Sequence, residues 1–155
     1  MGYIENNLMA GEEVVYKAKL HWIIFSGAVF LGLLGLILTI LGISNTAEIN
    51  TYLYLGIFII VAAPLLFLRA WIYWKTSEFG VTNKRVLIKV GWIKRHSLEI
   101  LLQKVEGIGV DQSIVGRMLN YGTIFVSGTG GTKEPFKNIE NPLEFRKQVQ
   151  NRIPH

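Results

Sequence analysis

The sequence contains no cysteine among its 155 residues. Disulfide bonds, a thiolate nucleophile and thiolate metal ligands are therefore excluded. Charge is also scarce, because only 17% of the residues are Asp, Glu, Lys or Arg, against about 25% in an ordinary globular domain. The shortage is concentrated between Trp22 and Tyr73, where Glu48 and Arg69 are the only charged residues. The remainder, residues 75–155, has a normal composition and is long enough to close one hydrophobic core.

Two long hydrophobic runs fill the segment that is poor in charge. Trp22–Ile43 carries no charge, and as a helix it would be about 33 Å long, enough for a hydrocarbon core of about 30 Å. Tyr52–Trp74 is a second run of similar length. The alternative is a pair of buried helices in a soluble protein, but two runs of this length are hard to bury in so small a chain. We therefore predict a transmembrane helical hairpin over residues 22–74.

Charges beside the two runs predict their orientation. The short connection, residues 44–51, has one acid and no base, whereas Lys17 and Lys19 precede the first run and Lys75 follows the second. Basic flanking residues stay in the cytoplasm. We therefore expect both termini to be cytoplasmic and the connection to lie outside. Because some twenty polar residues precede the first run, we expect it to remain in the mature protein.

A stripe of small residues marks one face of the first run. Its members recur at spacings of four and three: Ala28, Gly32, Gly35, Thr39 and Gly42. At 100° per residue they lie within about 80° of arc. Such a stripe allows close approach of another helix in lipid. The partner is either the second run, through Gly56 and Ala63, or another copy of the chain, and the sequence leaves both open.

From Thr76 onward, short strands alternate with turns. The predicted strands are SEFGVT, RVLIKV, WIKRHSLEI, KVEGIGVDQ, TIFVSG and TKEPFKNI. Ser113 is placed to cap a short helical turn, SIVGRML. Upstream of the first run, the alternating residues Val14, Tyr16, Ala18 and Leu20 predict an extra strand or extended arm that packs near the sheet.

The last segment, NPLEFRKQVQNRI, changes to a helical period. Asn141 is placed as the N-cap, Pro142 at the first helical position and Glu144 as its partner in a capping box. One apolar stripe recurs at every fourth position: Phe145, Val149 and Ile153. The predicted fold class is α+β, with a strand-rich sheet or barrel closed by one amphipathic C-terminal helix.

The order of these segments resembles a known family. GEEVV and HW precede the two runs, TSEFGVTNKRVLIK follows them, and QKVEGI and DQSIVGRMLNYGTIFV come next. This order is similar, over nearly the whole chain, to the bacterial membrane-flanked family of pleckstrin-homology-like (PH-like) domains. Its most specific part runs from Gln112 to Gly122. The resemblance implies a strongly bent, seven-stranded antiparallel sheet or barrel capped by the C-terminal helix, in the inner (plasma) membrane of a bacterium. The family usually has Gly where Asn120 stands, and both residues tolerate a left-handed turn.

No constellation of side chains predicts catalysis. Residues 128–133, GTGGTK, lack the Gly-Lys-Ser/Thr ending of a P-loop and are flanked by strands, so we expect a hairpin turn. The histidines His21, His96 and His155 do not have metal-ligand spacing. We therefore expect no catalytic residues, no cofactor, no metal site and no small-molecule substrate.

The remaining functional signal is positive charge. Residues 75–155 contain 13 Lys and Arg against 7 Asp and Glu. The candidate lipid or partner contacts are the two basic pairs and the Trp between them: Lys84, Arg85, Trp92, Lys94 and Arg95. They either bind anionic headgroups, at about 1 kcal/mol per basic residue near the surface, or serve only to orient the helices. Nucleic acid is not expected, because the chain has no recognition helix and no aromatic-basic stacking motif.

Three functions remain open on the sequence alone. The first is a non-catalytic, membrane-anchored interaction module that binds a protein partner or self-assembles at the cytoplasmic face. The second is recognition of anionic lipid by the basic domain, and the third is a small accessory subunit of a transport or channel assembly.

Overall fold

The computed structural model describes residues 2–44, 51–92, 95–129 and 133–153. The chain divides into two compact units. Met1–His21 and Trp74–His155 form the first, which we call the strand unit, and Trp22–Tyr73 forms the second, the helical unit.

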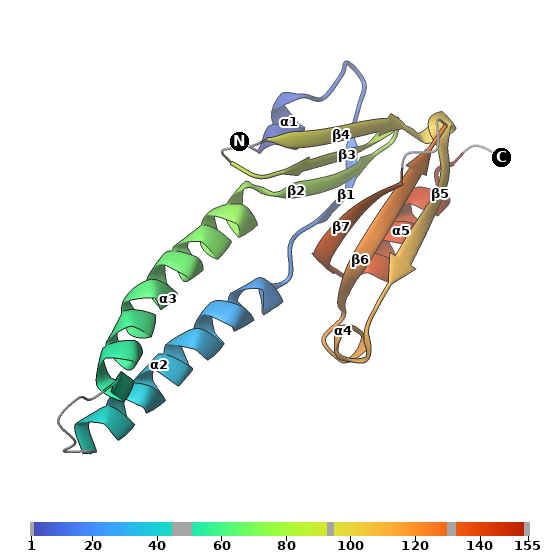
Figure 1. Cartoon of the computed structure of the whole chain (residues 1–155). Coiled ribbons are helices and arrows are strands. Elements are labelled where there is room, and N and C mark those ends of the chain that lie inside the picture. The colour runs from blue at the N-terminus through green and yellow to red at the C-terminus, as the bar shows by residue number, and fades with distance from the viewer. Residues whose placement is uncertain (1, 45–50, 93–94, 130–132, 154–155) are drawn as a thin grey trace. The chain divides into compact units, whose positions relative to one another are not determined.

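Two antiparallel sheets make up the strand unit (Figure 1). The first has the order β1 (Val14–Ala18), β2 (Glu78–Thr82), β3 (Arg85–Val90) and β4 (His96–Leu101). The second has the order β5 (Val105–Asp111), β6 (Tyr121–Gly128) and β7 (Lys133–Glu140). The described strands therefore do not close into a barrel, which corrects that part of the expected architecture. An isolated bridge between Leu20 and Ile139 is one link between the two sheets.

The first strand comes from the segment before the apolar runs, as its alternating pattern predicted. β1 pairs antiparallel with β2, with Lys17 opposite Gly80 and Ala18 opposite Phe79. Leu20, two residues further on, is fully buried. The seven strands expected from the family resemblance are thus reached only when this strand is included. The strand unit therefore contains residues 1–21 as well as the chain after Tyr73.

Short helices complete the unit: α1 (Tyr3–Asn6), η2 (Leu102–Lys104), α4 (Ile114–Met118) and α5 (Pro142–Gln150). Helix α5 lies against the strands and buries Phe145 and Val149 completely, as the apolar stripe predicted. Its start differs from the prediction. Asn141 has left-handed backbone angles and makes no side-chain cap, because its side-chain oxygen accepts a hydrogen bond from Asn120. Glu144 instead accepts from Gln148 at 2.6 Å, so the predicted capping box is wrong.

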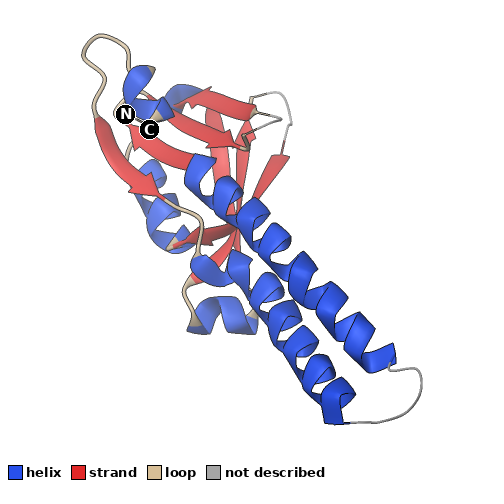
Figure 2. Cartoon of the chain, turned by 90° about the vertical axis from the view of Figure 1, so that its left-hand side faces the viewer, coloured by secondary structure: helices blue, strands red, loops and turns tan. Residues whose placement is uncertain are grey.

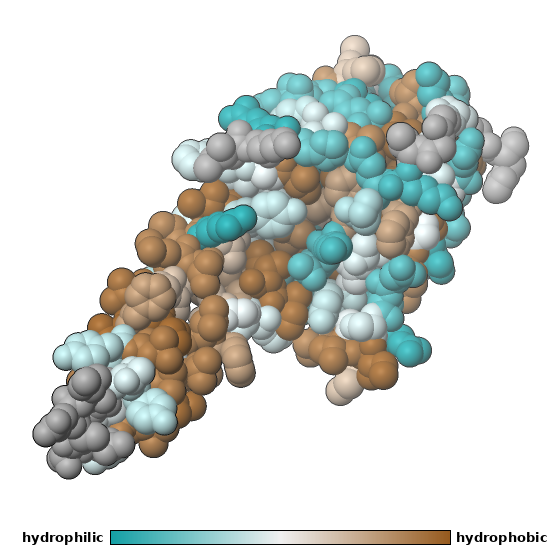
Figure 3. Space-filling model, viewed as in Figure 1, coloured by the Kyte–Doolittle hydropathy of each residue, from teal (hydrophilic) through white to brown (hydrophobic). Residues whose placement is uncertain are grey.

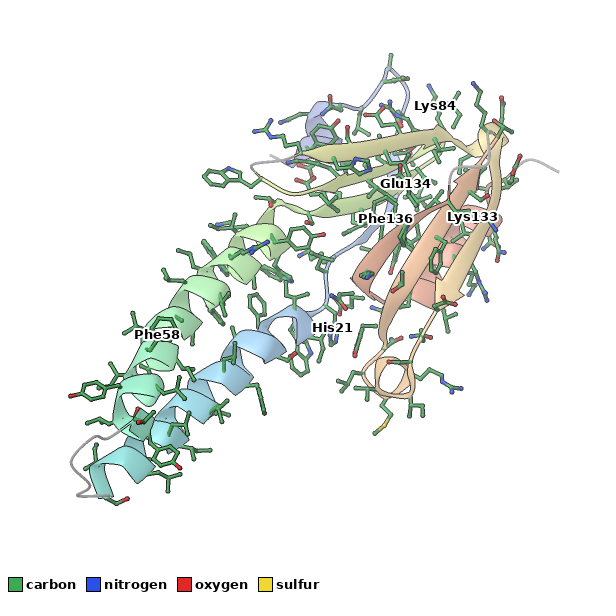
Figure 4. The ribbon with its side chains drawn as sticks, in the orientation of Figure 1. His21, Phe58, Lys84, Lys133, Glu134 and Phe136 are labelled. Atoms are coloured by element: carbon green, nitrogen blue, oxygen red, sulfur yellow. The ribbon has the colours of Figure 1, made fainter. Side chains whose placement is uncertain are left out.

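The helical unit contains η1 (Trp22–Phe25), α2 (Ser26–Ser44) and α3, which extends from Thr51 through Thr76 into the strand unit. Figure 2 shows α2 and α3 running side by side as two long helices. By length and composition, both helices are long and apolar enough to cross a membrane. Most of their large apolar side chains are exposed, as the brown surface in Figure 3 shows. Phe58 of α3, labelled in Figure 4, is one of them.

The small-residue stripe of α2 faces α3. Of its members, Ala28, Gly35 and Gly42 are buried. A Cβ added at Gly42 would lie 2.5 Å from the backbone nitrogen of Leu53, and one added at Gly56 would overlap the Thr39 hydroxyl. A Cβ at Gly32 would lie 3.7 Å from that of Ala63. The backbones of the two helices therefore approach too closely for larger side chains at these positions.

Candidate functional site

The candidate basic residues do not form one cluster. Lys84 lies in the turn before β3, whereas Trp92 and Arg95 follow its other end. Because β3 has six residues, these two groups are about 20 Å apart. Figure 4 shows Lys84 at the end of the sheet away from the start of β2. The remaining member, Lys94, lies outside the described residues.

Arg85 is buried and therefore does not belong to the candidate surface. Its side chain is only 7% exposed, and its Nε donates to Oε1 of Glu12 at 2.9 Å. Its Nη1 donates to Glu99 at 2.6 Å and its Nη2 to the backbone oxygen of Asn7 at 2.5 Å. All of its donor groups are thus directed into the protein. The expectation that Arg85 offers its charge to a lipid or partner is therefore corrected.

Glu12 is the partner that the sequence did not reveal. Burial alone would raise the pKa of its carboxyl, but hydrogen bonds from Arg85, the Met9 amide and the Thr82 hydroxyl lower that pKa to about 2. The side chain is completely buried and ionised, as a buried charge that is paired and hydrogen-bonded can be. The arrangement fastens the segment before β1 to the turn between β2 and β3.

The chain passes between the two units at one end of the strand unit. It leaves after His21 and returns at Trp74, and the indole Nε1 of Trp74 donates to the backbone oxygen of Leu20 at 2.6 Å. The backbone amide of His21 donates to the oxygen of Asn138 at 2.7 Å. The ring of His21, labelled in Figure 4, stacks on that of Tyr121 with centroids 5.1 Å apart. We call this end of the strand unit the exit end.

Strand register brings further residues to the exit end. Glu78, at the start of β2, is opposite Lys89, near the end of β3. Val90 is in turn opposite His96, the first residue of β4. The turn that carries Trp92 and Arg95 therefore lies at the exit end, and both side chains are exposed. Lys84 lies at the opposite end, where its ammonium donates to the backbone oxygen of Ala10 at 2.8 Å.

A hollow of about 280 Å³ opens at the exit end, entirely within the strand unit. We call it the exit hollow. Its lining residues are Gly2, Ile4, Lys17, Ala18, Lys19, Trp74, Lys75, Ser77, Glu78 and Phe79. Three of these carry an ammonium group and one carries a carboxylate, so the lining is basic on balance.

The single acid that lines the exit hollow, Glu78, accepts hydrogen bonds from two backbone amides. The two carboxylate oxygens of Glu78 accept from the amides of Tyr3 at 2.8 Å and Ile4 at 3.1 Å. Lys17 is paired with Glu5, outside the lining, at 2.5 Å. Ammonium groups beside an indole suit a compact anion such as a phosphate group, which lysine binds as a point charge.

Only part of this site is predictable from the sequence. The charges of Lys17, Lys19 and Lys75 predict orientation alone, because nothing local connects residues 17–19 with residues 74–79. The pairing of β1 with β2 brings the two segments together. Within the described part of the chain, no group of His, Asp and Glu residues is arranged to hold a metal ion.

Comparison with known proteins adds the family. A family model described as "Bacterial PH domain" matches residues 20–153, which is most of the chain. Searches of curated proteins and of solved structures each gave no significant match. The match includes both apolar helices, all strands after β1 and helix α5. The chain therefore belongs to the bacterial PH domain family.

Proposed function

We propose that the chain is a non-catalytic, membrane-anchored PH-like interaction module. Helices α2 and α3 cross a bacterial inner membrane as a hairpin, and the strand unit binds a protein partner, or other copies of itself, at the cytoplasmic face. The observation that carries this proposal is the meeting of both chain passages at the exit end, where Trp74 Nε1 donates to the Leu20 oxygen. Two attachments at one end restrict the orientation of the strand unit far more than a single linker would.

Composition and charge support the anchoring. The exposed apolar surface of α2 and α3 costs about 25 cal/mol per Å² in water, and lipid removes that cost. Lys17, Lys19 and Lys75 flank the two helices at the exit end, where the positive-inside rule places basic residues in the cytoplasm.

Topology is testable because the chain has no cysteine. Single-cysteine variants Ser44→Cys, at the end of α2, and Lys137→Cys, on the exposed face of β7, are treated with a membrane-impermeant maleimide in intact spheroplasts. We expect labelling of Ser44→Cys alone, and labelling of both variants after lysis. Labelling of Lys137→Cys in intact cells would overturn the proposed orientation.

Sheet edges support partner binding or self-assembly. β1 and β4 are the two edges of the first sheet, and each pairs with only one neighbouring strand there. An edge strand offers unpaired backbone groups to another chain. The small-residue face of α2, in contrast, already packs on α3. Extraction in mild detergent should give a complex larger than one chain, and a monomer that carries no partner would count against the proposal.

A second candidate function, recognition of anionic lipid, is favoured by the exit hollow. We expect the purified full-length chain to retain phosphatidylglycerol in preference to phosphatidylcholine, as measured by native mass spectrometry. The double variant Lys19→Glu and Lys75→Glu should lose that preference. Lys84→Glu, the same reversal at the opposite end of the sheet, is the matched control and should keep it. Equal lipid retention by all three proteins would remove this candidate.

A further inference from the structure

Helix α4 and the residue after it carry apolar side chains on the protein surface. The exposed fractions are 73% for Ile114, 51% for Val115, 80% for Met118 and 37% for Leu119. We call these four residues the apolar knob. In Figure 3 they form a brown patch over α4, at the tip between β5 and β6. A contiguous apolar patch on an exposed tip indicates a contact surface rather than ordinary scatter.

Polar groups beneath the knob fix its backbone. The Ser113 hydroxyl accepts from the Gly116 amide at 3.0 Å and caps α4, as its position in the sequence predicted. Gln112 donates from Nε2 to the backbone oxygens of Gly116 at 3.3 Å and Tyr121 at 3.0 Å. A Cβ added at Gly116 would lie 2.7 Å from the Tyr121 oxygen. The usual distribution is thus inverted, because polar side chains hold the turn from inside while apolar side chains face outward.

Contacts of Tyr121 connect the knob to the exit end. Tyr121 follows Leu119 by two residues, and its ring stacks on that of His21, the last residue before the chain enters the helical unit. Tyr121 is paired with Glu140, whose amide donates to the Lys19 oxygen at 2.9 Å. The knob therefore lies on the strand unit beside the point where the chain leaves toward η1 and α2.

One base accompanies the apolar side chains. Arg117 is the only charged residue from Gln112 to Gly122, and it is exposed. A base next to apolar residues suits the boundary between acyl chains and phosphate headgroups. An aqueous protein surface or an acidic partner would favour additional polar residues around it.

We propose that the apolar knob inserts into the interfacial layer of the bilayer that α2 and α3 cross, with Arg117 at the headgroup phosphates. The inference rests on the membrane anchoring proposed above. The insertion gives the strand unit a third attachment to the membrane, in addition to its two covalent links to the helical unit. It also gives a function to residues 112–122, the most specific sequence motif of the chain.

The test uses nitroxide labels on single cysteines in the full-length chain, reconstituted into vesicles of phosphatidylethanolamine and phosphatidylglycerol. Met118→Cys reports on the knob, Lys137→Cys is the exposed control on β7, and Ile37→Cys reports on the interior of α2. These three positions are exposed in the structure, so the substitutions leave the packing intact. Accessibility of each label to oxygen and to a water-soluble nickel complex is measured.

We expect the oxygen-to-nickel accessibility ratio at Met118→Cys to exceed that at Lys137→Cys several-fold, and to fall to the control value in the double variant with Ile114→Glu. If the ratio at Met118→Cys equals that at Lys137→Cys while Ile37→Cys reports acyl-chain contact, the proposed insertion of the knob is overturned and the proposed anchoring is not. Failure of Ile37→Cys to report acyl chains would instead overturn the anchoring itself. Protection of Met118→Cys from both oxygen and the nickel complex would assign the knob to a protein contact and overturn the inference.

Discussion

The guanidinium of Arg85 and the carboxylate of Glu12 form a buried ion pair across 73 positions of the sequence, with Nε and Oε1 2.9 Å apart. The pair is completed by the Thr82 hydroxyl and the Met9 amide on Glu12, and by Glu99 and the Asn7 oxygen on Arg85. Every polar contact of the pair thus lies within the strand unit. It joins the N-terminal segment to the first sheet.

Removing one member of this pair should destabilise the strand unit strongly. Arg85→Met leaves the Glu12 carboxylate buried without its main partner, which typically costs 3–5 kcal/mol, about the scale of a whole small domain's stability margin. We expect a large drop in the urea midpoint of the full-length chain in detergent, followed by near-UV circular dichroism. Glu5→Gln is the control, because it removes the exposed pair with Lys17, and it should leave the midpoint almost unchanged. Equal midpoints for Arg85→Met and the wild type would contradict this assignment.

Acid should act on the same pair. The pKa of Glu12 is about 2 in the folded chain, against an ordinary value of 4.5. A carboxyl with a depressed folded pKa contributes stability that is complete above its unfolded pKa and is lost as the pH falls toward the folded value. The urea midpoint should therefore fall between about pH 5 and pH 2.

The control for the acid effect is Glu12→Gln, which starts from a lower midpoint and should lose less between pH 6 and pH 3 than the wild type. Its midpoint should still decrease slightly, because the Lys17 ammonium lowers the pKa of Glu5 as well. Parallel pH profiles for the two proteins would show that Glu12 is not the group responsible.

Elements that depend on local period were predictable from the sequence. The strand before the first apolar run, the two apolar helices and the buried stripe of α5 all follow from spacing within a single segment. The hairpin between β6 and β7 was predicted too, although its turn at residues 130–132 lies outside the described part of the chain. The prediction of a capping box was wrong because Asn141 adopts left-handed backbone angles, which a sequence pattern does not specify.

The candidate site was less predictable because it depends on strand pairing. Lys84 and Arg95 belong to two basic pairs of one candidate surface, yet β3 lies between them and places them at opposite ends of the sheet. Arg85 and Lys84 are adjacent bases that the sequence does not distinguish, yet Arg85 is buried and pairs with an acid 73 positions away. The exit hollow likewise joins residues 17–19 to residues 74–79 through the register of β1 on β2. No local signal distinguishes a base that will be buried from one that will remain exposed.

The packing of α2 on α3 can be tested by a designed crosslink. The Cβ of a residue at position 32 would lie 3.7 Å from that of Ala63, within the range of a disulfide bond. We expect the double variant Gly32→Cys and Ala63→Cys to oxidise within one chain, seen as a faster-migrating monomer on a non-reducing gel. A covalent dimer would show instead that the small-residue face packs between chains.

The rate at which that crosslink forms should depend on the close approach of α3 to α2 at Gly56. Gly56→Val places side-chain atoms against Thr39 of α2, so the two helices must separate and the crosslink should form more slowly. Gly27→Val is the matched control on α2, because nothing lies within 4 Å of a Cβ at that position. Equal oxidation rates in the two variants would contradict the observed packing.

The hydrogen bond from Trp74 to Leu20 should hold the two chain passages together. Trp74→Phe keeps an aromatic ring but removes the Nε1 donor, a loss of about 1 kcal/mol for a typical hydrogen bond. We expect faster hydrogen exchange at the neighbouring amide of His21, which donates to Asn138. Trp92→Phe, at an exposed position of the same unit, is the control and should leave this amide unchanged. Identical exchange in both variants would mean that the passages are held by the strands alone, and the exit end would then owe its geometry to the pairing of Leu20 with Ile139.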